Sequence, residues 1–306
     1  MKTCILLNPG ARNGTRQDEV ERQVESVPGF EVWPTEHANH AQELAQKAAD
    51  EGFDSVVAAG GDGTVNEVVN GLMAAKPAAR PRFGLLPLGT GNDLARTLKI
   101  PTDLAQALEI LQRGDTRPCD VVRLRTGDTC RHFVNISAAG FSGTVNENLT
   151  SEIKRSWGPL AYLRAAVESL SELTDFAAFS LRLTFDDEET ITTDGLNLVV
   201  ANARFVAAGI PVAPLAEIDD GLMDILLFKP HDLAELATLT AKVLVSRHLE
   251  GEDERVFYRR ASTLEVLSDP PLPLNVDGEM LEEPVGHARF ELLAGALEVV
   301  VGPDTA

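Results

Sequence analysis

The sequence predicts two domains: an α/β domain built on a doubly wound parallel sheet, followed by a larger antiparallel β-sandwich. Three observations lead to this fold class. In roughly the first 125 residues, apolar strand-like runs alternate with segments of helical periodicity. Glycine-bearing turns follow several of these runs, at what would be the carboxyl ends of parallel strands. After about residue 119, short alternating runs take over, as in a sandwich.

The expected elements follow in order along the chain. Strands of the first domain are expected at 3–7, 30–33, 55–59 and 83–88, and its helices at 18–27, 40–51, 65–75 and 104–113. Strands of the second domain are expected at 121–125, 131–137, 180–185, 197–202, 223–228, 262–267 and 297–301, with helices at 160–173 and 233–245. The boundary is expected near Arg125, which gives domains 1–125 and 126–306, with the option that the final strand returns to the first domain.

Composition narrows the function. The 306 residues carry a formal net charge of −20, which argues against nucleic-acid binding because that needs a basic face. No apolar run approaches the roughly 20 residues needed to span a bilayer, and the first apolar run is too short for a signal peptide. The three cysteines show no metal-ligand spacing. We therefore expect a cytoplasmic protein without a transmembrane segment.

The stretch AAGGDGTVNEVV, residues 58–69, joins an apolar run to a helical one. Its glycines allow close approach of a ligand to the backbone, and the N–H groups of a helix start attract phosphate. A carboxylate beside phosphate needs a cation or a proton-transfer role, so Asp62 suggests Mg²⁺ or a base. The sequence contains no GxxxxGK[ST], and no GxGxxG follows a strand, so neither a P-loop nor a Rossmann NAD site is expected.

Further motifs occur in one order along the chain. GGDGTVNEVVNG is followed by PLGTGNDLAR, and NPGARNG, GPLAYL, APLAEIDDGLMDI and NVDGE accompany them. Together they resemble the diacylglycerol kinase catalytic family over nearly the whole length, and within it the soluble bacterial lipid kinases. The resemblance implies an NAD kinase-like nucleotide domain joined to a sandwich, with ATP and Mg²⁺ in the cleft.

The resemblance also implies the residues that bind the nucleotide. They are Asn8, Gly14, Thr35, Gly60, Gly61, Asp62, Gly63, Thr64, Val65, Asn66, Thr90, Asn92 and Asp93. Asp93 has an alternative role as the N-cap of a helix over 94–98.

The catalytic candidates are Glu279, Asp62 and Asp277. In the soluble bacterial members the glutamate of VDGE is the proton acceptor, which is Glu279 here. From the residues alone, Asp277-Gly278 is also an ordinary type I′ hairpin turn. Asp62 either orients Mg²⁺ through water or serves as the base.

EIDDGLMD resembles the structural metal loop of the family. Glu217 and Leu222 would contribute carbonyl oxygens and Asp220 a carboxylate, which suits Mg²⁺ or Ca²⁺. The alternative is a solvated acidic hairpin.

The function expected from these motifs is ATP-dependent phosphorylation of a lipid hydroxyl at a membrane surface, with diacylglycerol first. The alternatives are an NAD kinase and a non-catalytic nucleotide-binding regulator. Peripheral membrane contact is expected at Lys154, Arg155 and Trp157, where basic and aromatic residues gather. The oligomeric state stays open, with a homodimer as one possibility.

Overall fold

The computed structural model describes residues 2–11, 17–140, 179–250 and 253–303. Gly14, the expected helix over 160–173, and the membrane-contact residues Lys154, Arg155 and Trp157 lie outside these ranges. The chain divides into two compact units. Unit 1 consists of Met1–Val121 and Ala294–Ala306, and unit 2 is Val122–Leu293. The expected boundary at Arg125 lies inside β5 (Thr116–Thr126), and β16 (Val285–Val300) contributes residues to both units.

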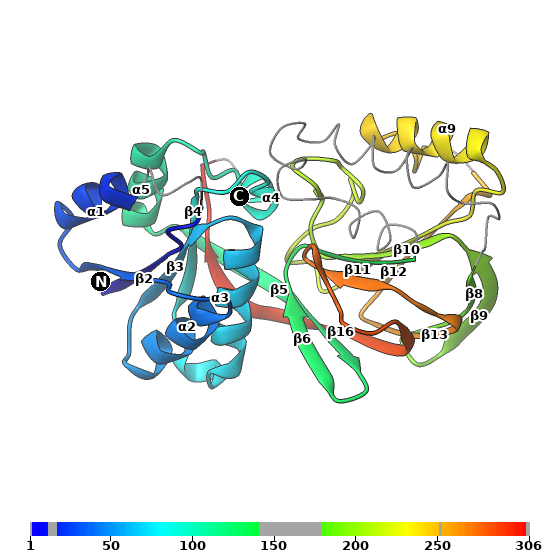
Figure 1. Ribbon diagram of the computed structural model, residues 1–306, viewed down its shortest axis with the longest axis horizontal. Helices are drawn as coiled ribbons and strands as arrows, with labels where there is room; N and C mark the ends of the chain where they lie inside the picture. The colour runs from blue at the N-terminus through cyan, green and yellow to red at the C-terminus, as the bar shows by residue number, and fades with distance from the viewer. Residues whose placement is uncertain (1, 12–16, 141–178, 251–252, 304–306) are drawn as a thin grey trace. The chain divides into compact units, whose positions relative to one another are not determined.

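Unit 1 is an α/β domain with a parallel sheet (Figure 1). Its strands are β1 (Thr3–Leu7), β2 (Phe30–Pro34), β3 (Ser55–Gly60) and β4 (Arg82–Pro87), in the order β2-β1-β3-β4. Its helices are α1 (Gln17–Glu25), α2 (His40–Asp50), α3 (Asp62–Ala74), the 3₁₀ turn η1 (Pro77–Ala79), α4 (Asp93–Thr97) and α5 (Leu104–Arg113). Every residue of β1 and β3 is buried, as expected for a parallel sheet with covered faces.

The strand order creates a switch point. From β1 the chain continues to β2 on one side, whereas β3 pairs with β1 on the other side, and both pairings are parallel. Ligands of doubly wound sheets bind outside the carboxyl ends of the strands at such a point. The segments that leave β1 and β3 there begin at Asn8 and Gly61.

Unit 2 is a sandwich of two antiparallel layers. One layer has the order β12 (Val256–Ala261), β11 (Met223–Phe228), β10 (Asn197–Ala201), β7 (Ile136–Gly140), β14 (Leu274–Val276), β15 (Glu279–Met280). The other contains β16, β13 (Thr263–Leu272), β8 (Phe179–Phe185) and β9 (Glu189–Gly195), with β5 and β6 (Thr129–Phe133) beside them. Phe133, Phe185 and Phe290 from the second layer fill the core with Leu198 and Ile225 from the first.

The fold class is confirmed, while several boundaries differ from expectation. The expected strand over 131–137 is two strands, β6 and β7, which belong to different sheets. The chain crosses between the two layers at Val134 and Asn135. The alternation of apolar and polar residues along the sequence does not show such a crossing, so the prediction joined the two strands. β9 and β12 were not expected, and β16 is longer than the expected 297–301. Helix α3 starts at Asp62 rather than at the expected residue 65. Its first turn contains glycine and threonine instead of apolar residues, so the apolar periodicity behind the prediction did not extend to it.

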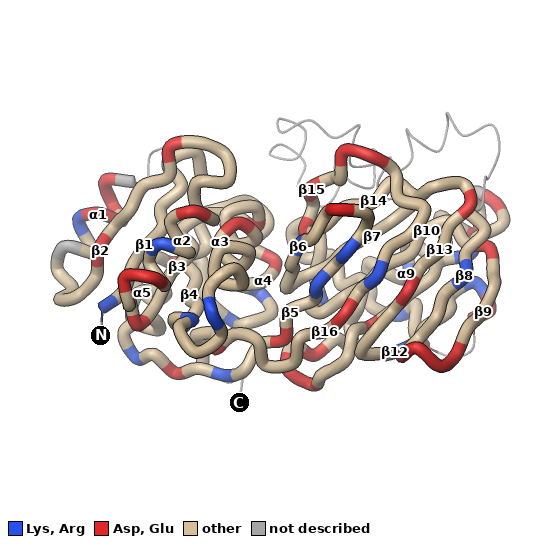
Figure 2. Tube along the Cα trace, turned by 90° about the horizontal axis from the view of Figure 1, so that it is seen from below, with Lys and Arg blue, Asp and Glu red and all other residues tan. Residues whose placement is uncertain are grey.

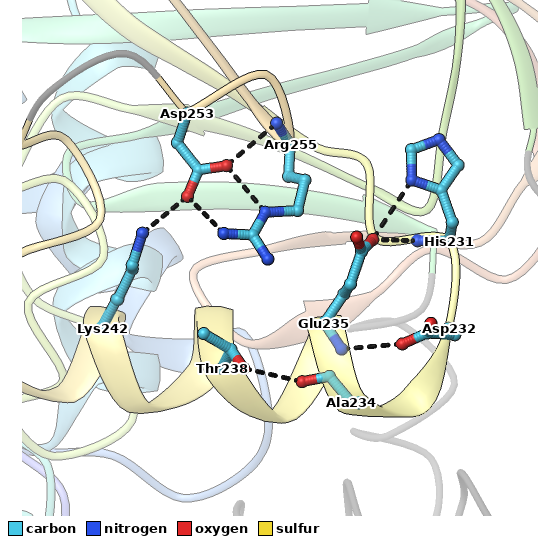
Figure 3. A network of polar contacts seen from close by, with 8 residues as sticks. All are labelled: His231, Asp232, Ala234, Glu235, Thr238, Lys242, Asp253 and Arg255. Atoms are coloured by element: carbon cyan, nitrogen blue, oxygen red, sulfur yellow. Dashed lines mark hydrogen bonds and ion pairs between the residues drawn. The ribbon is translucent and has the colours of Figure 1, made fainter.

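Helix α9 (Leu233–Leu244) covers the outer face of the β7–β10–β11 layer, where Leu239 packs against Leu226 and Phe228. Asp253 accepts hydrogen bonds from Lys242 Nζ at 2.7 Å and Arg255 Nε at 2.7 Å, which ties the helix to the start of β12 (Figure 3). Within the described ranges, no helix is both long and apolar enough to span a bilayer. Acidic positions recur along the loops of both units, whereas basic positions are scattered (Figure 2).

Candidate functional site

A depression of about 530 Å³ opens at the switch point of unit 1. The segments after β1 and β2 and the first turns of α2 and α3 supply its walls, and the lining residues are Asn8, Pro9, Gly10, Thr35, Glu36, His37, Ala38, Ala41, Thr64 and Glu67. The structure therefore brings together Asn8, Thr35 and Thr64, which are far apart in the sequence. The N–H groups at the start of α3 have no acceptor within their own helix, which is the usual setting for bound phosphate.

Hydrogen bonds hold these walls in place. Asn8 Nδ2 donates to Thr64 Oγ1 at 3.0 Å, and Asn8 Oδ1 accepts the Gly10 N–H at 2.9 Å. The Thr35 N–H donates to the Leu7 carbonyl at 2.8 Å, which continues the β1–β2 pairing beyond the strand. The loop after β1 is thus fastened to α3 by a side chain.

Asp62 links the two glycine loops of unit 1. Its Oδ2 accepts the Asn92 N–H at 2.9 Å, and its Oδ1 accepts the Asp93 N–H at 2.8 Å. These two N–H groups belong to the start of α4, so a carboxylate from the first turn of α3 caps a different helix. Both oxygens of Asp62 are engaged in fixing the loop 89–93 against the loop 60–63.

The glycines allow this approach. A Cβ on Gly89 would lie 2.3 Å from the Gly61 Cα, and a Cβ on Gly91 would lie 2.3 Å from Asp62 Oδ2. Neither contact could be relieved by a flexible side chain moving away, because one partner is backbone and the other is the fixed carboxylate. The GGDG and GTGND motifs are therefore two halves of one packed contact.

Burial raises the pKa of the Asp62 carboxyl above its ordinary value, while hydrogen bonds from Asp93 and Asn92 and the charge of Arg96 act in the opposite direction. Burial is the largest of these effects. Burial thus disfavours the charged form of Asp62, and a nearby cation would favour that form.

The remaining expected nucleotide residues have distinct surroundings. Asn92 closes its loop by accepting the Gly89 N–H at 3.0 Å and donating to the Gly89 carbonyl at 2.9 Å. Asn92, with φ of 54°, is the N-cap of α4, and Asp93 is the first helical residue and buried. Thr90 is exposed. Val65 and Asn66 are buried on the inner side of α3.

The Asp277–Glu279 turn forms in unit 2. Val276 pairs with Glu279 across a two-residue turn, and Asp277 and Gly278 have φ of 48° and 89°, as in a type I′ hairpin. Asp277 Oδ1 accepts the N–H groups of Asn135 and Ile136 at 3.2 and 3.0 Å. Asp277 thus anchors the turn to the start of β7, and the exposed Glu279 projects from a fixed backbone.

Asp220 has partners of its own. Its Oδ1 accepts the Leu222 N–H at 3.0 Å, and its Oδ2 contacts the Arg260 guanidinium. The resemblance assigns this carboxylate to a metal ion, whereas in the structure it meets an arginine and a backbone N–H.

Glu67 and His37 are two polar residues of the depression that the predicted nucleotide site did not include. Glu67 Oε2 accepts the Ala41 N–H at 3.0 Å and so caps α2. Its spacing of three from Thr64 places both on one face of α3, which was the available signal. His37 lines the same wall, and its ring stacks on His40 at 4.5 Å. His37, His40 and Glu43 bring possible ligand atoms within 4.8 Å, but His40 Nδ1 already accepts the Glu36 N–H.

The structure defines a class of fold: an α/β domain, with a depression at the carboxyl ends of its parallel strands, followed by a β-sandwich. Comparison with known proteins gives the family. Residues 2–124 match the diacylglycerol kinase catalytic domain, and residues 135–301 match the YegS C-terminal NAD kinase beta sandwich-like domain. The chain belongs to the diacylglycerol kinase family.

Curated relatives agree with this assignment, and solved structures agree with the fold. A diacylglycerol kinase of Staphylococcus saprophyticus is 33% identical over 82% of this chain and 79% of its own, and one of Staphylococcus aureus is 34% identical over 82% and 76%. A crystal structure of a diacylglycerol kinase from Bacillus anthracis has a TM-score of 0.73 at 22% identity, covering 100% of this chain and 98% of that one. Yeast NADH kinase in complex with NADH has a TM-score of 0.55 at 15% identity, covering 100% of this chain and 84% of that one. These two structures are likenesses of fold.

Proposed function

We propose that this kinase transfers the γ-phosphate of ATP to the free hydroxyl of diacylglycerol, giving phosphatidic acid and ADP. The observation that carries the proposal is the Asp62 clamp, which fixes two glycine loops beside a depression at the switch point of the sheet. The relatives that match over most of the chain are named diacylglycerol kinase, which supports the acceptor.

In this proposal the depression of unit 1 holds ATP. Asn8 and Thr35 contact the nucleoside; Gly14, which was expected to do the same, lies outside the described residues. The backbone of residues 60–66 binds the phosphates through N–H groups at the start of α3, so that no P-loop lysine is needed. Thr90 adds a hydroxyl from the neighbouring loop, where the backbone is held by Asn92 and Asp62.

The residues around Asp62 fit Mg²⁺. A Cβ on Gly91 would lie 2.3 Å from Asp62 Oδ2 and 3.5 Å from Asp93 Oδ2, so two carboxylates approach one another at that point. Carboxylate oxygens are the ligands that Mg²⁺ accepts, usually with several of its waters retained. When bound, the ion would neutralise charge on the phosphates. Asp62 and Asp93 would orient it.

Glu279 receives the proton of the acceptor hydroxyl. The oxygen of that hydroxyl forms a bond to the γ-phosphorus, the bond to the β–γ bridging oxygen breaks, and ADP leaves with the electron pair. The carboxylate of Glu279 is exposed and stands on a turn that Asp277 holds. An exposed carboxylate on a fixed backbone suits a general base, because its position is defined while its oxygens stay accessible.

A labelling experiment tests the proposal. The purified protein is incubated with γ-labelled ATP, Mg²⁺ and mixed micelles that contain diacylglycerol, monoacylglycerol or a sphingoid base, and separately with NAD⁺. We expect label in phosphatidic acid, little label in the other lipids, and none after addition of EDTA. Label in NADP⁺ alone would support a small-molecule kinase and contradict the lipid assignment. ATP binding without transfer to any acceptor would indicate a regulator.

A further inference from the structure

The loop before β11 meets a small group of charged side chains that the proposed kinase chemistry does not use. Antiparallel pairing of β11 with β12 sets Asp224 opposite Arg260, and Leu226 opposite Tyr258. Alternate residues of a strand share a face, so Asp224, Tyr258 and Arg260 lie on the same face of the sheet. Asp220 reaches this group from the loop.

The contacts run from one side chain to the next. Arg260 Nη2 contacts Asp220 Oδ2, and Arg260 Nε lies 3.9 Å from Asp224 Oδ2. Tyr258 Oη donates to Asp224 Oδ1 at 2.7 Å. Among the described residues, Asp224 Oδ2 is buried and accepts no hydrogen bond. The charge that faces this oxygen is therefore the guanidinium of Arg260, with Arg204 as a further positive charge that acts on Asp224.

Burial makes compensation necessary. The Asp224 side chain is 1% exposed and the Asp220 side chain 20% exposed, and Glu217 adds a third negative charge that acts on Asp224. A carboxylate removed from water is strongly destabilising unless a cation or several donors satisfy it. One guanidinium with several N–H donors can face two carboxylates at once.

This arrangement does not fit a resident divalent ion. Such an ion would need the carboxylate of Asp220, and Oδ2 of this carboxylate already meets a cation, the Arg260 guanidinium. An added ion next to the guanidinium would be repelled by its charge. A divalent ion could enter only if Arg260 left.

We propose that Arg260 is the built-in cation of the loop 217–224: its guanidinium neutralises Asp220 and Asp224 in the place of a divalent ion. Removing the guanidinium should then create a site for Mg²⁺ or Ca²⁺. The proposal concerns the stability of unit 2 and does not depend on which acceptor the kinase uses.

Thermal unfolding without nucleotide tests this proposal. The Tm is measured in EDTA and in about 10 mM MgCl₂ or CaCl₂ for the wild type, Arg260→Gln and the double variant Arg260→Gln/Asp220→Asn. The matched control is Arg259→Gln, which removes an arginine of the same strand that pairs with the exposed Glu189. A chain of net charge −20 attracts cations everywhere, so each shift is read as a difference from this control.

We expect the wild type and the control to respond equally to the cations. Arg260→Gln should have a Tm several degrees lower in EDTA and recover much of the loss in CaCl₂ or MgCl₂, because an ion that binds only the folded state stabilises it. The double variant should not recover. Calorimetric titration with CaCl₂ should show a site in Arg260→Gln that the wild type lacks.

Two results would overturn the proposal. One is a wild-type Tm that rises with Mg²⁺ beyond the control and loses this rise in Asp220→Asn, since the native loop would then hold an ion. The other is an Arg260→Gln variant with no gain in cation response. If Arg260→Gln does not fold, Arg260→Lys replaces it; retention of the cation-insensitive Tm supports the proposal, and a new cation-dependent rise contradicts it.

Discussion

Asp62 and Glu279 are both acidic residues that directly follow a glycine, yet their surroundings are opposite. Asp62 is engaged at both oxygens by backbone N–H groups of another loop, and burial raises its pKa. Glu279 is exposed, and its neighbour Asp277 makes the backbone contacts that fix the turn. In the Asp62 region the carboxylate itself accepts the hydrogen bonds that hold the loops together. In the Glu279 region Asp277 holds the turn, and the proposed proton transfer belongs to Glu279.

The difference indicates that the two carboxylates suit different roles. A carboxylate whose oxygens hold two loops together is suited to placing phosphates and Mg²⁺, because any movement would separate the loops. A carboxylate with accessible oxygens on a rigid turn is suited to accepting a proton. We therefore propose Glu279 as the base and Asp62 as a positioning residue, and the following predictions test this contrast.

The largest expected effect is that of Glu279→Gln. We predict that kcat falls by about 10²-fold or more, on the scale of a lost general base, while Tm and the KM for ATP stay near the wild-type values. The readouts are steady-state kinetics on lipid micelles and thermal unfolding. Glu283→Gln, at an exposed acid shortly after the turn, is the matched control and should be fully active. A nearly unchanged kcat in Glu279→Gln would indicate that Asp62, rather than Glu279, is the base.

Asp62→Ala should have a mixed effect. We predict a fall in kcat of about 10²-fold, a raised KM for ATP and a lowered Tm, because two part-buried N–H groups at the start of α4 lose their acceptor. Asp103→Ala is the control: it removes a carboxylate that caps α5 through the Gln106 N–H at 3.0 Å and should lower Tm without affecting kcat. An Asp62→Ala enzyme with wild-type Tm would show that the clamp does not hold the loops.

Thr90→Ala should have a smaller effect on the same side of the comparison. The hydroxyl lies on the loop that Asp62 fixes, so its loss should raise the KM for ATP by about tenfold or less, the scale of one hydrogen bond, with kcat little changed. Thr129→Ala, at an exposed position of β6, should leave both constants unchanged. A fall in kcat with unchanged KM would mean that Thr90 acts only in the transition state.

The smallest effect concerns an acid with no part in the proposed chemistry. Hydrogen bonds from Arg255 and Lys242 hold the pKa of Asp253 well below its usual range (Figure 3). A lowered folded pKa contributes stability that is complete above the ordinary value of about 3.9 and is lost as the pH falls toward the folded pKa. Asp253→Asn should therefore lower Tm by a few degrees at pH 7 and leave kcat unchanged. The Tm gap to the wild type should narrow below about pH 4; a gap independent of pH would contradict the ion-pair account.

The turns of the site could be predicted because their signals are local. Gly60 and Gly61 follow an apolar run and precede a helical one, and the Asp277-Gly278 pair marks a type I′ turn. The structure contains both features. The order of a parallel sheet followed by antiparallel strands could also be predicted, because the apolar periodicity that indicates it lies within each segment.

Contacts between distant segments could not be predicted in the same way. Asp62 and Asp93 are separated by 31 positions, and nothing in either motif shows that the carboxylate of one caps the helix of the other. The Arg260 partner of Asp220 depends on the pairing of β11 with β12, and β12 was not expected. The role of Arg260 therefore became visible only once the strands were paired.

The most direct test of the division between Asp62 and Glu279 is the pH dependence of a single turnover. The rate of γ-phosphate transfer to diacylglycerol is measured by rapid quench with saturating ATP, Mg²⁺ and lipid, for the wild type, Glu279→Gln and Asp62→Ala. We predict that the wild-type rate falls toward acid pH, that Asp62→Ala shows the same fall from a lower plateau, and that Glu279→Gln is slow at every pH without that fall. A flat profile in Asp62→Ala together with a wild-type fall in Glu279→Gln would contradict the account and make Asp62 the base.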